Sequence, residues 1–156
     1  MLITETTSPE AIEAAVLLLP PGEYEFGGGV KVTITTDGTR IWFQNGMFHR
    51  EDGPAIESVT GARRWLVNGA LHREDGPAID GPDGLRMWYR NNKKHREDGP
   101  AVEGADGTRE WWVDGMRHRV DGPAVMKPNG SQEWWINGKR ERAKRKQSKS
   151  IEPAVG

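Results

Sequence analysis

The sequence predicts an all-β protein made of tandem β-hairpins that form an elongated, twisted sheet or solenoid, with a short helix near the N-terminus. Tryptophan recurs every 23 residues, and histidine follows it at the same period: Trp42, Trp65, Trp88, Trp111 and Trp134, then His49, His72, His95 and His118. Turn-forming dipeptides recur between strand-like segments at that period. An unbroken period indicates one supersecondary unit copied in register, with each copy packing on its neighbours.

Residues 1–36 precede the repeats, and we expect them to form a cap. A helix is predicted over about residues 8–19, because the residues at its start suit an N-cap, a first turn and a capping box: Thr7 or Ser8, Pro9 and Glu10. Its apolar residues fall on one face: Ile12, Val16 and Leu19. Pro20 ends it. The alternative is a partner-binding helix. Alternation from Val30 to Ile34 predicts a half-buried strand.

Residues 37–142 hold five repeats, each with one turn inside it and a second turn before the next copy. The inner turns are Asn45-Gly46, Asn68-Gly69, Asn91-Asn92, Asp114-Gly115 and Asn137-Gly138, and the outer turns are Gly61, Asp83-Gly84, Asp106-Gly107 and Asn129-Gly130. Two turns per repeat predict an antiparallel hairpin in each and a meander of about ten short strands. In the fifth repeat Glu141 replaces the histidine and Asp-Gly-Pro-Ala is lost. A basic tail, residues 143–156, follows, and we expect residues 141–156 to be mobile.

A tryptophan, a nearby glycine and a basic–His pair, repeated about every 23 residues and joined by Asp-Gly turns, resemble the MORN (membrane occupation and recognition nexus) repeat. The resemblance covers about residues 37–142 and is closest to divergent variants from bacteria, bacteriophages and giant viruses. It implies stacked hairpins in a long twisted sheet, most often used for protein–protein scaffolding and in some members for lipid binding. Arginine here replaces the usual glycine after the histidine, which argues against lipid binding: Arg50, Arg73, Arg96 and Arg119.

A two-residue turn at Asn45-Gly46 fixes the register of the first hairpin, so Gln44 opposes Met47. The same count places tryptophan opposite histidine in four repeats, as Trp42–His49, Trp65–His72, Trp88–His95 and Trp111–His118. It places arginine opposite glutamate as Arg40–Glu51, Arg63–Glu74 and Arg86–Glu97. In the fourth repeat Val120 opposes Arg109, and in the fifth Glu141 opposes Trp134. We call the side with these pairs face one and expect a largely structural role for it.

The other side of the sheet, face two, changes character along the chain. Its predicted cross-strand pairs are Phe43–Phe48, Leu66–Leu71, Tyr89–Lys94, Trp112–Arg117 and Trp135–Arg140. The first two pairs are apolar, and we expect the N-terminal helix to cover them. The last three join an aromatic ring to a cation, and we expect them to be exposed. Trp and Arg are enriched at interface hot spots, so we predict that these three pairs bind a partner.

Repeated His, Arg and Glu do not predict a catalytic or metal site here. Equivalent residues of successive repeats lie two strands apart, roughly 9–10 Å, whereas zinc ligands lie about 2.0–2.1 Å from the ion. No nucleophile elbow, phosphate-binding loop or metalloprotease helix is present in the sequence. We therefore expect no enzymatic activity, no metal and no cofactor.

Charge and composition bound the location and the partners. Lys139 to Ser150 contain seven basic residues and one acidic residue, a local charge of +6, which leaves −7 for the rest of a chain of net charge −1. The chain has no cysteine, which fits a reducing compartment. No basic run precedes the N-terminal apolar stretch, and the longest apolar run, Ala14 to Leu19, is too short to span a bilayer. We expect a cytoplasmic protein.

Together these patterns predict a non-enzymatic protein that presents the aromatic–basic pairs of face two to a protein partner. The resemblance to MORN repeats implies a phage or bacterial protein that inhibits or sequesters a host factor. The alternative is a nucleic-acid binder that uses the same face and the basic tail. An unpaired end strand could also pair with a second copy. Under the first hypothesis Trp112→Ala loses partner binding with the fold intact, whereas Trp65→Ala damages the fold.

Overall fold

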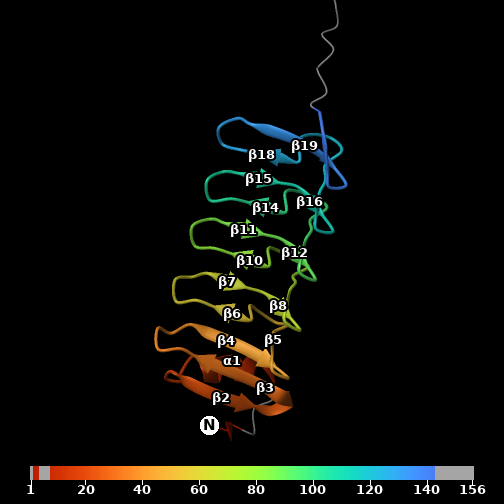
Figure 1. Ribbon diagram of the computed structural model, residues 1–156. Helices are drawn as coiled ribbons and strands as arrows, with labels where there is room; N and C mark the ends of the chain where they lie inside the picture. Colours follow the sequence, from red (N-terminus) through yellow and green to blue (C-terminus); the bar gives the residue numbers. More distant parts are fainter. Residues whose placement is uncertain (1, 4–7, 143–156) are drawn as a thin grey trace, which may run out of the picture.

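The computed structural model describes residues 2–3 and 8–142. They form a stack of β-hairpins along one elongated, open sheet, with a single short helix at the N-terminal end (Figure 1). The predicted all-β repeat fold is therefore confirmed. The expected basic tail lies outside the described residues.

The N-terminal cap contains a helix, α1 (Pro9–Val16), three residues shorter at its C-terminal end than predicted. Ser8, not Thr7, is its N-cap, and the Ser8 hydroxyl accepts a hydrogen bond from the Ala11 N–H at 3.3 Å. The cap also contains β1 (Leu2–Ile3), β2 (Gly22–Phe26), a short 3-10 turn (Gly27–Gly29) and β3 (Val30–Ile34). β3 is the strand that the alternation predicts, whereas β2 and the short β1 parallel to it are not predicted.

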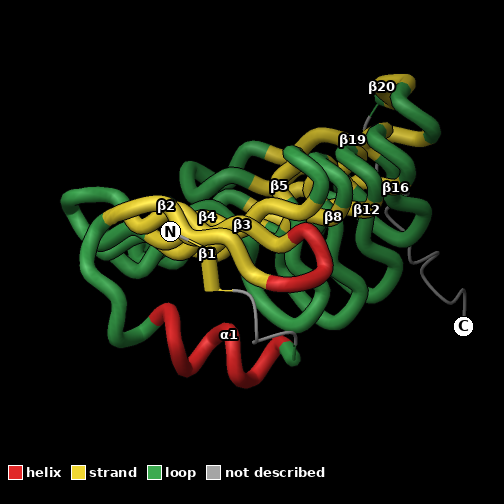
Figure 2. The backbone as a smooth tube through the Cα atoms, turned by 90° about the horizontal axis from the view of Figure 1, so that it is seen from below, coloured by secondary structure: helices red, strands yellow, loops and turns green. Residues whose placement is uncertain are grey.

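Helix α1 lies on one side of β2 and β3 (Figure 2). This side is face one of the first strands, and the helix covers it. Its buried residues join a single apolar cluster with residues of the sheet: Ile12, Val16, Tyr24, Phe26, Val32, Ile34 and Trp42. The prediction that the helix covers the apolar pairs of face two is therefore wrong. Face one offers the helix a deeper apolar surface there, because Trp42 lies opposite Val32 in the register.

Each of the first four repeats contributes two strand segments to the main sheet, and the described part of the fifth contributes one. These strands are β4 (Arg40–Gln44), β6 (Ile56–Glu57), β7 (Arg63–Arg64), β10 (Ile79–Asp80), β11 (Arg86–Met87), β14 (Val102–Glu103), β15 (Arg109–Glu110), β18 (Val125–Met126) and the start of β19 (Gln132–Ile136). They follow one another in chain order and all pair antiparallel. The outer turns join the end of one repeat to the start of the next, and they all lie at the strand ends on one side of the stack (Figure 1).

The inner turns belong to short hairpins that form an arm beside the main sheet. The arm strands are β5 (Met47–Phe48), β8 (Leu66–Val67), β9 (Ala70–Leu71), β12 (Tyr89–Arg90), β13 (Lys93–Lys94), β16 (Trp112–Val113), β17 (Met116–Arg117) and β20 (Lys139–Glu141). Asn45 and Gly46 both have positive φ, as a two-residue hairpin turn requires. The predicted register is confirmed in every arm for the pairs of face two.

Neighbouring arms are joined by backbone hydrogen bonds. Arg50 donates its N–H to the Leu66 carbonyl at 3.0 Å, and Gly69 donates to the Phe48 carbonyl at 2.8 Å. The same two bonds recur at each later junction, at 2.9–3.2 Å. Every repeat is therefore held to the next through both the main sheet and the arm, as expected of a solenoid in which each unit contacts its neighbours.

The predicted Arg–Glu pairs are wrong, although the Trp–His pairing of the backbone is confirmed. His72 donates its N–H to the Trp65 carbonyl at 3.1 Å, but the Trp65 N–H turns away and donates to Ala78. The arm therefore separates from the main sheet at the tryptophan of each of the first four repeats, and the arginine two residues earlier pairs with another acidic residue. In the main sheet the charges alternate as Arg40, Glu57, Arg63, Asp80, Arg86, Glu103 and Arg109.

Candidate functional site

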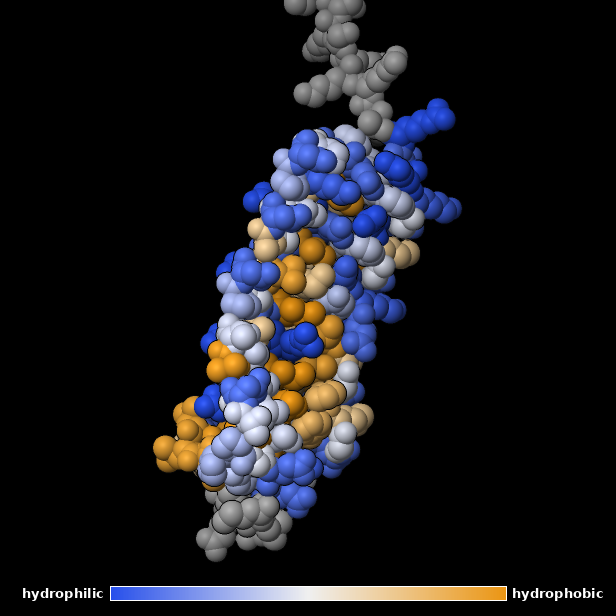
Figure 3. All heavy atoms as spheres, turned by 60° about the vertical axis from the view of Figure 1, so that its left-hand side comes forward, coloured by the Kyte–Doolittle hydropathy of each residue, from blue (hydrophilic) through white to orange (hydrophobic). Residues whose placement is uncertain are grey.

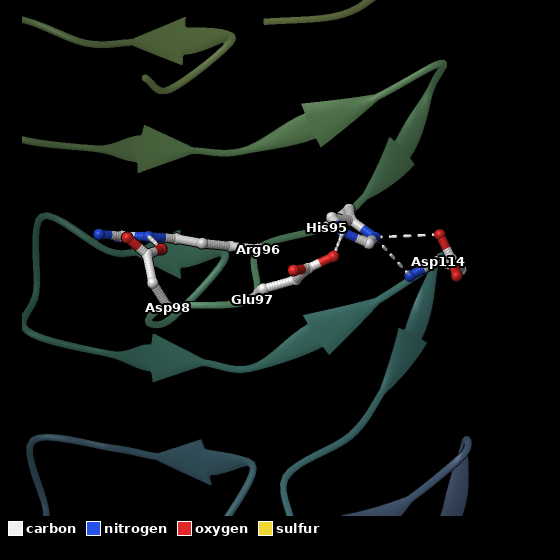
Figure 4. A network of polar contacts seen from close by, with 5 residues as sticks. All are labelled: His95, Arg96, Glu97, Asp98 and Asp114. Carbon is white, nitrogen blue, oxygen red and sulfur yellow. Dashed lines mark hydrogen bonds and ion pairs between the residues drawn. The ribbon is translucent and has the colours of Figure 1, made fainter. Parts of the chain in front are cut away.

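The histidine column links one repeat to the next. His49 Nδ1 accepts a hydrogen bond from the Asn68 N–H at 3.1 Å, and the same contact recurs as His72–Asn91, His95–Asp114 and His118–Asn137. The other ring nitrogen of His95 lies 3.3 Å from Glu97 (Figure 4). Because each ring is committed to the turn of the following repeat, the histidines act as structural connectors.

The arginine after each histidine covers the tryptophan of its own repeat. The guanidinium carbon lies 3.9–4.4 Å from the ring centre in the pairs Arg50–Trp42, Arg73–Trp65, Arg96–Trp88 and Arg119–Trp111. Each arginine also binds an aspartate two residues later, as Arg96 binds Asp98 at 2.8 Å (Figure 4). These cation–π contacts give the arginine of the first four repeats a structural role: it covers the tryptophan on face one.

Acid titration provides a test of these arginine contacts. Hydrogen bonding to the arginine lowers the pKa of the carboxyl in Asp75, Asp98 and Asp121. A lowered folded-state pKa gives stability that is present above the ordinary aspartate value and is lost as the pH falls through the folded-state value. We expect the triple variant Asp75→Asn, Asp98→Asn, Asp121→Asn to melt below the wild type at pH 7, with the two melting temperatures converging as the pH falls below the ordinary aspartate range. A gap that stays constant from pH 7 to pH 2 would contradict this expectation.

The histidine connectors also bear on metal binding. Within residues 2–3 and 8–142 no group of three or more His, Cys, Asp or Glu side chains is placed to hold a metal ion. We expect the untagged protein to retain less than about 0.1 zinc or nickel per chain after dialysis, because zinc sites need three or four protein ligands around one ion and each histidine is held at the turn of the next repeat. Elemental analysis tests this, and about one metal per chain would overturn it.

The aromatic–basic pairs of face two build a continuous column that we call the aromatic–cation ladder: Lys94, Trp112, Arg117 and Trp135. Trp112 lies between two cations, with the Lys94 amine at 4.7 Å and the Arg117 guanidinium at 5.1 Å from its ring centre. Arg117 in turn lies 5.3 Å from the Trp135 ring. Lys94 contacts a ring of the following arm, and Arg117 contacts one ring of its own arm and one of the following arm. The ladder therefore depends on the stacking of successive arms.

Two glutamates complete this site and were not predicted. Glu110 accepts a hydrogen bond from the Trp112 indole N–H at 2.8 Å and binds Arg117 at 3.2 Å. Glu133 accepts from the Trp135 indole at 2.9 Å, which lowers the pKa of its carboxyl. Each glutamate stands two residues before its tryptophan, on the same side of the strand. This period-2 relation was the available signal.

The six predicted site residues differ in how far they are buried and in which contacts they make. Both tryptophans and Arg117 are half-buried rather than exposed, because the ladder and its glutamates pack against one another. Tyr89 pairs with Lys94 in the register and is half-buried, which raises the pKa of its hydroxyl. Arg140 is exposed and lies 3.9 Å from Glu133. The predicted face is therefore assembled as a packed surface and not as a row of protruding rings.

In the main sheet, beside the arms, the same face is largely apolar. Its main-sheet residues include Ile41, Ile56, Ile79, Met87 and Val102, interrupted by Arg64, which pairs with both Ile56 and Ile79. Figure 3 shows apolar side chains gathered in a stripe along the long axis, with hydrophilic side chains on both sides. The predicted change along face two concerns the arms, where the apolar pairs Phe43–Phe48 and Leu66–Leu71 precede the ladder. The apolar stripe of the main sheet is an additional feature that was not predicted.

Comparison of the chain with family models, with curated proteins and with solved structures gives no match. In the part of the chain that the structure describes, no helix has the length and apolar character needed to cross a membrane.

Proposed function

We propose that the chain is a non-enzymatic binding protein whose aromatic–cation ladder receives a protein partner. The observation that supports this most directly is the ladder itself, in which stacked arms hold two indole rings and two cations in fixed positions on one face. Preorganised Trp and Arg side chains bind with little loss of side-chain entropy, and these residue types dominate interface hot spots. The adjoining apolar stripe extends the surface that a partner could bury.

The charge of the ladder favours a protein over a nucleic acid. Arg117 is bound to Glu110 at 3.2 Å and lies 4.0 Å from Glu133, so its charge is largely balanced within the site. Phosphate recognition depends on uncompensated cations, and a carboxylate beside each ring repels a phosphate backbone. A polypeptide can instead satisfy the same glutamates with its own N–H groups or basic side chains.

On the MORN-like resemblance, we propose further that the chain acts as a bacterial or bacteriophage inhibitor that sequesters a cytoplasmic protein. Affinity capture from a bacterial lysate tests both proposals, with the wild type, Trp135→Ala and Met116→Ala as parallel baits. Met116 belongs to the arm that carries Arg117 but pairs with Val113, on the opposite side of the hairpin.

The expected result is one protein that the wild type and Met116→Ala capture and Trp135→Ala does not. Binding of single-stranded oligonucleotides is the companion measurement. Affinity that falls steeply between 50 and 200 mM salt, as counterion release predicts, would favour the nucleic-acid alternative. Equal capture by all three baits would place the binding surface elsewhere.

A further inference from the structure

Asparagine is followed directly by glycine at four places in the chain: Asn45-Gly46, Asn68-Gly69, Asn129-Gly130 and Asn137-Gly138. All four pairs lie in turns and are exposed. An asparagine in this context can lose ammonia, because the backbone nitrogen of the next residue can attack its side-chain carbonyl carbon. Glycine makes the attack easiest, since it carries no Cβ to shield the nitrogen and its backbone reaches the most conformations.

Three of the four glycines hold their backbone nitrogen in a hydrogen bond. The bonds run from Gly69 to the Phe48 carbonyl at 2.8 Å, from Gly130 to the Lys127 carbonyl at 3.0 Å and from Gly138 to the Arg117 carbonyl at 2.9 Å. In the two arm turns, those of Gly69 and Gly138, the acceptor belongs to the preceding arm. A nitrogen held in this way has to give up its bond before it can attack the asparagine.

Gly46 is the exception, because its arm is the first of the stack. No arm precedes it, and no described residue accepts its N–H. The cap contacts Asn45 instead, since Asn45 donates its own N–H to the Gly29 carbonyl at 3.3 Å. This bond holds the asparagine but not the nitrogen that would attack it. The stacking of arms therefore protects the later turns and leaves the first one unprotected.

We propose that Asn45 is the preferred deamidation site of the folded protein. The Gly46 nitrogen forms a bond to Asn45 Cγ, the bond from Cγ to the side-chain nitrogen breaks, and ammonia leaves with the proton of the Gly46 amide. The product is a succinimide ring. Water then adds to one of the two ring carbonyls and breaks its C–N bond. Opening at Cγ gives aspartate, and opening at the backbone carbonyl gives isoaspartate.

The modification falls at the contact between the cap and the first repeat. Asn45 and Gly46 form a two-residue turn that sets Gln44 opposite Met47. Isoaspartate adds one carbon to this backbone, so it disturbs the register of the hairpin and the hydrogen bond to Gly29. We expect the isoaspartate form to melt below the unmodified protein. The ladder lies in the third to fifth repeats, so the inference does not depend on the proposed function.

Peptide mapping by mass spectrometry tests the proposal. The full chain is incubated at mildly alkaline pH, either folded or in concentrated urea, and conversion is followed at each of the four pairs. In the folded chain we expect Asn45 to convert at least about threefold faster than the other three asparagines, the factor that follows from one backbone hydrogen bond of ordinary net strength. In urea this difference should disappear, because the pairs then differ only in the residues that flank them.

Asn45→Gly and Asn68→Gly are the matched variants. Each removes one carboxamide, and glycine accepts the positive φ of both positions. The acidic species that form first on ion-exchange chromatography should vanish in Asn45→Gly and persist in Asn68→Gly. Equal conversion of the four pairs in the folded chain, or early acidic species that survive in Asn45→Gly, would overturn the proposal. A preference for Asn45 that persists in urea would also overturn it, because the flanking sequence and not the stack would then be the cause.

Discussion

Replacing Trp42 with alanine is expected to destabilise the protein by about 3–5 kcal/mol, the usual cost of emptying a buried tryptophan site. Trp42 is 4% exposed and lies in the apolar cluster between α1 and the first strands. Arg50 covers its ring at 4.4 Å and also binds Glu13 of the helix at 3.0 Å. The substitution therefore removes the residue on which the helix, the first repeat and the buried arginine all pack.

The matched variant is Trp65→Ala, which removes the same residue one repeat later. Trp65 is also covered by an arginine, but it is half-buried and has no helix above it. We expect it to destabilise the fold as well, by a smaller amount. Denaturant unfolding followed by circular dichroism measures both changes. If Trp65→Ala costs as much as Trp42→Ala, packing of the helix on Trp42 adds no stability beyond that of a repeat without a helix.

The sequence predicts the hairpins well because their register is local. A two-residue turn determines which residues face each other over the next few positions, and the five pairs of face two follow from it. The same count fails further from the turn, for Arg63 and Glu74. It fails because the backbone N–H of Trp65 bonds to Ala78, and Arg63 then pairs with Glu57 instead. Where a strand changes partners is decided by packing between distant segments, so turn chemistry does not reveal it.

The candidate site was predicted in part for a related reason. Counting across the hairpin identifies Trp112 and Arg117 as neighbours, but it does not consider Glu110, which reaches the pair along the strand from the main sheet. Nor does it show that Lys94 of the preceding arm lies over Trp112, since that contact depends on how arms stack. Including these neighbours changes the surface from basic to charge-balanced, and it changes the class of partner that fits.

Trp112→Ala is expected to weaken binding of the captured partner by at least about 2 kcal/mol, or roughly 30-fold, as truncation of a central anchor does. The ring is the middle of the aromatic–cation ladder, and removing it separates Lys94 from Arg117 and leaves Glu110 without its indole donor. Because Trp112 is half-buried, we expect a lower melting temperature but a folded protein at 25 °C, since the stacked arms keep their backbone bonds.

Met116→Ala is the control for the ladder, since it truncates an exposed side chain of the same hairpin on the other side. Partner affinity by calorimetry and melting by circular dichroism are measured for both variants. Wild-type affinity in Trp112→Ala would remove the ladder from the binding surface. Equal weakening by Met116→Ala would move the contact to the hairpin tips. An unfolded Trp112→Ala at 25 °C would show that the ladder holds the arms together, and Lys94→Ala, which keeps both rings, would then be the variant that tests binding.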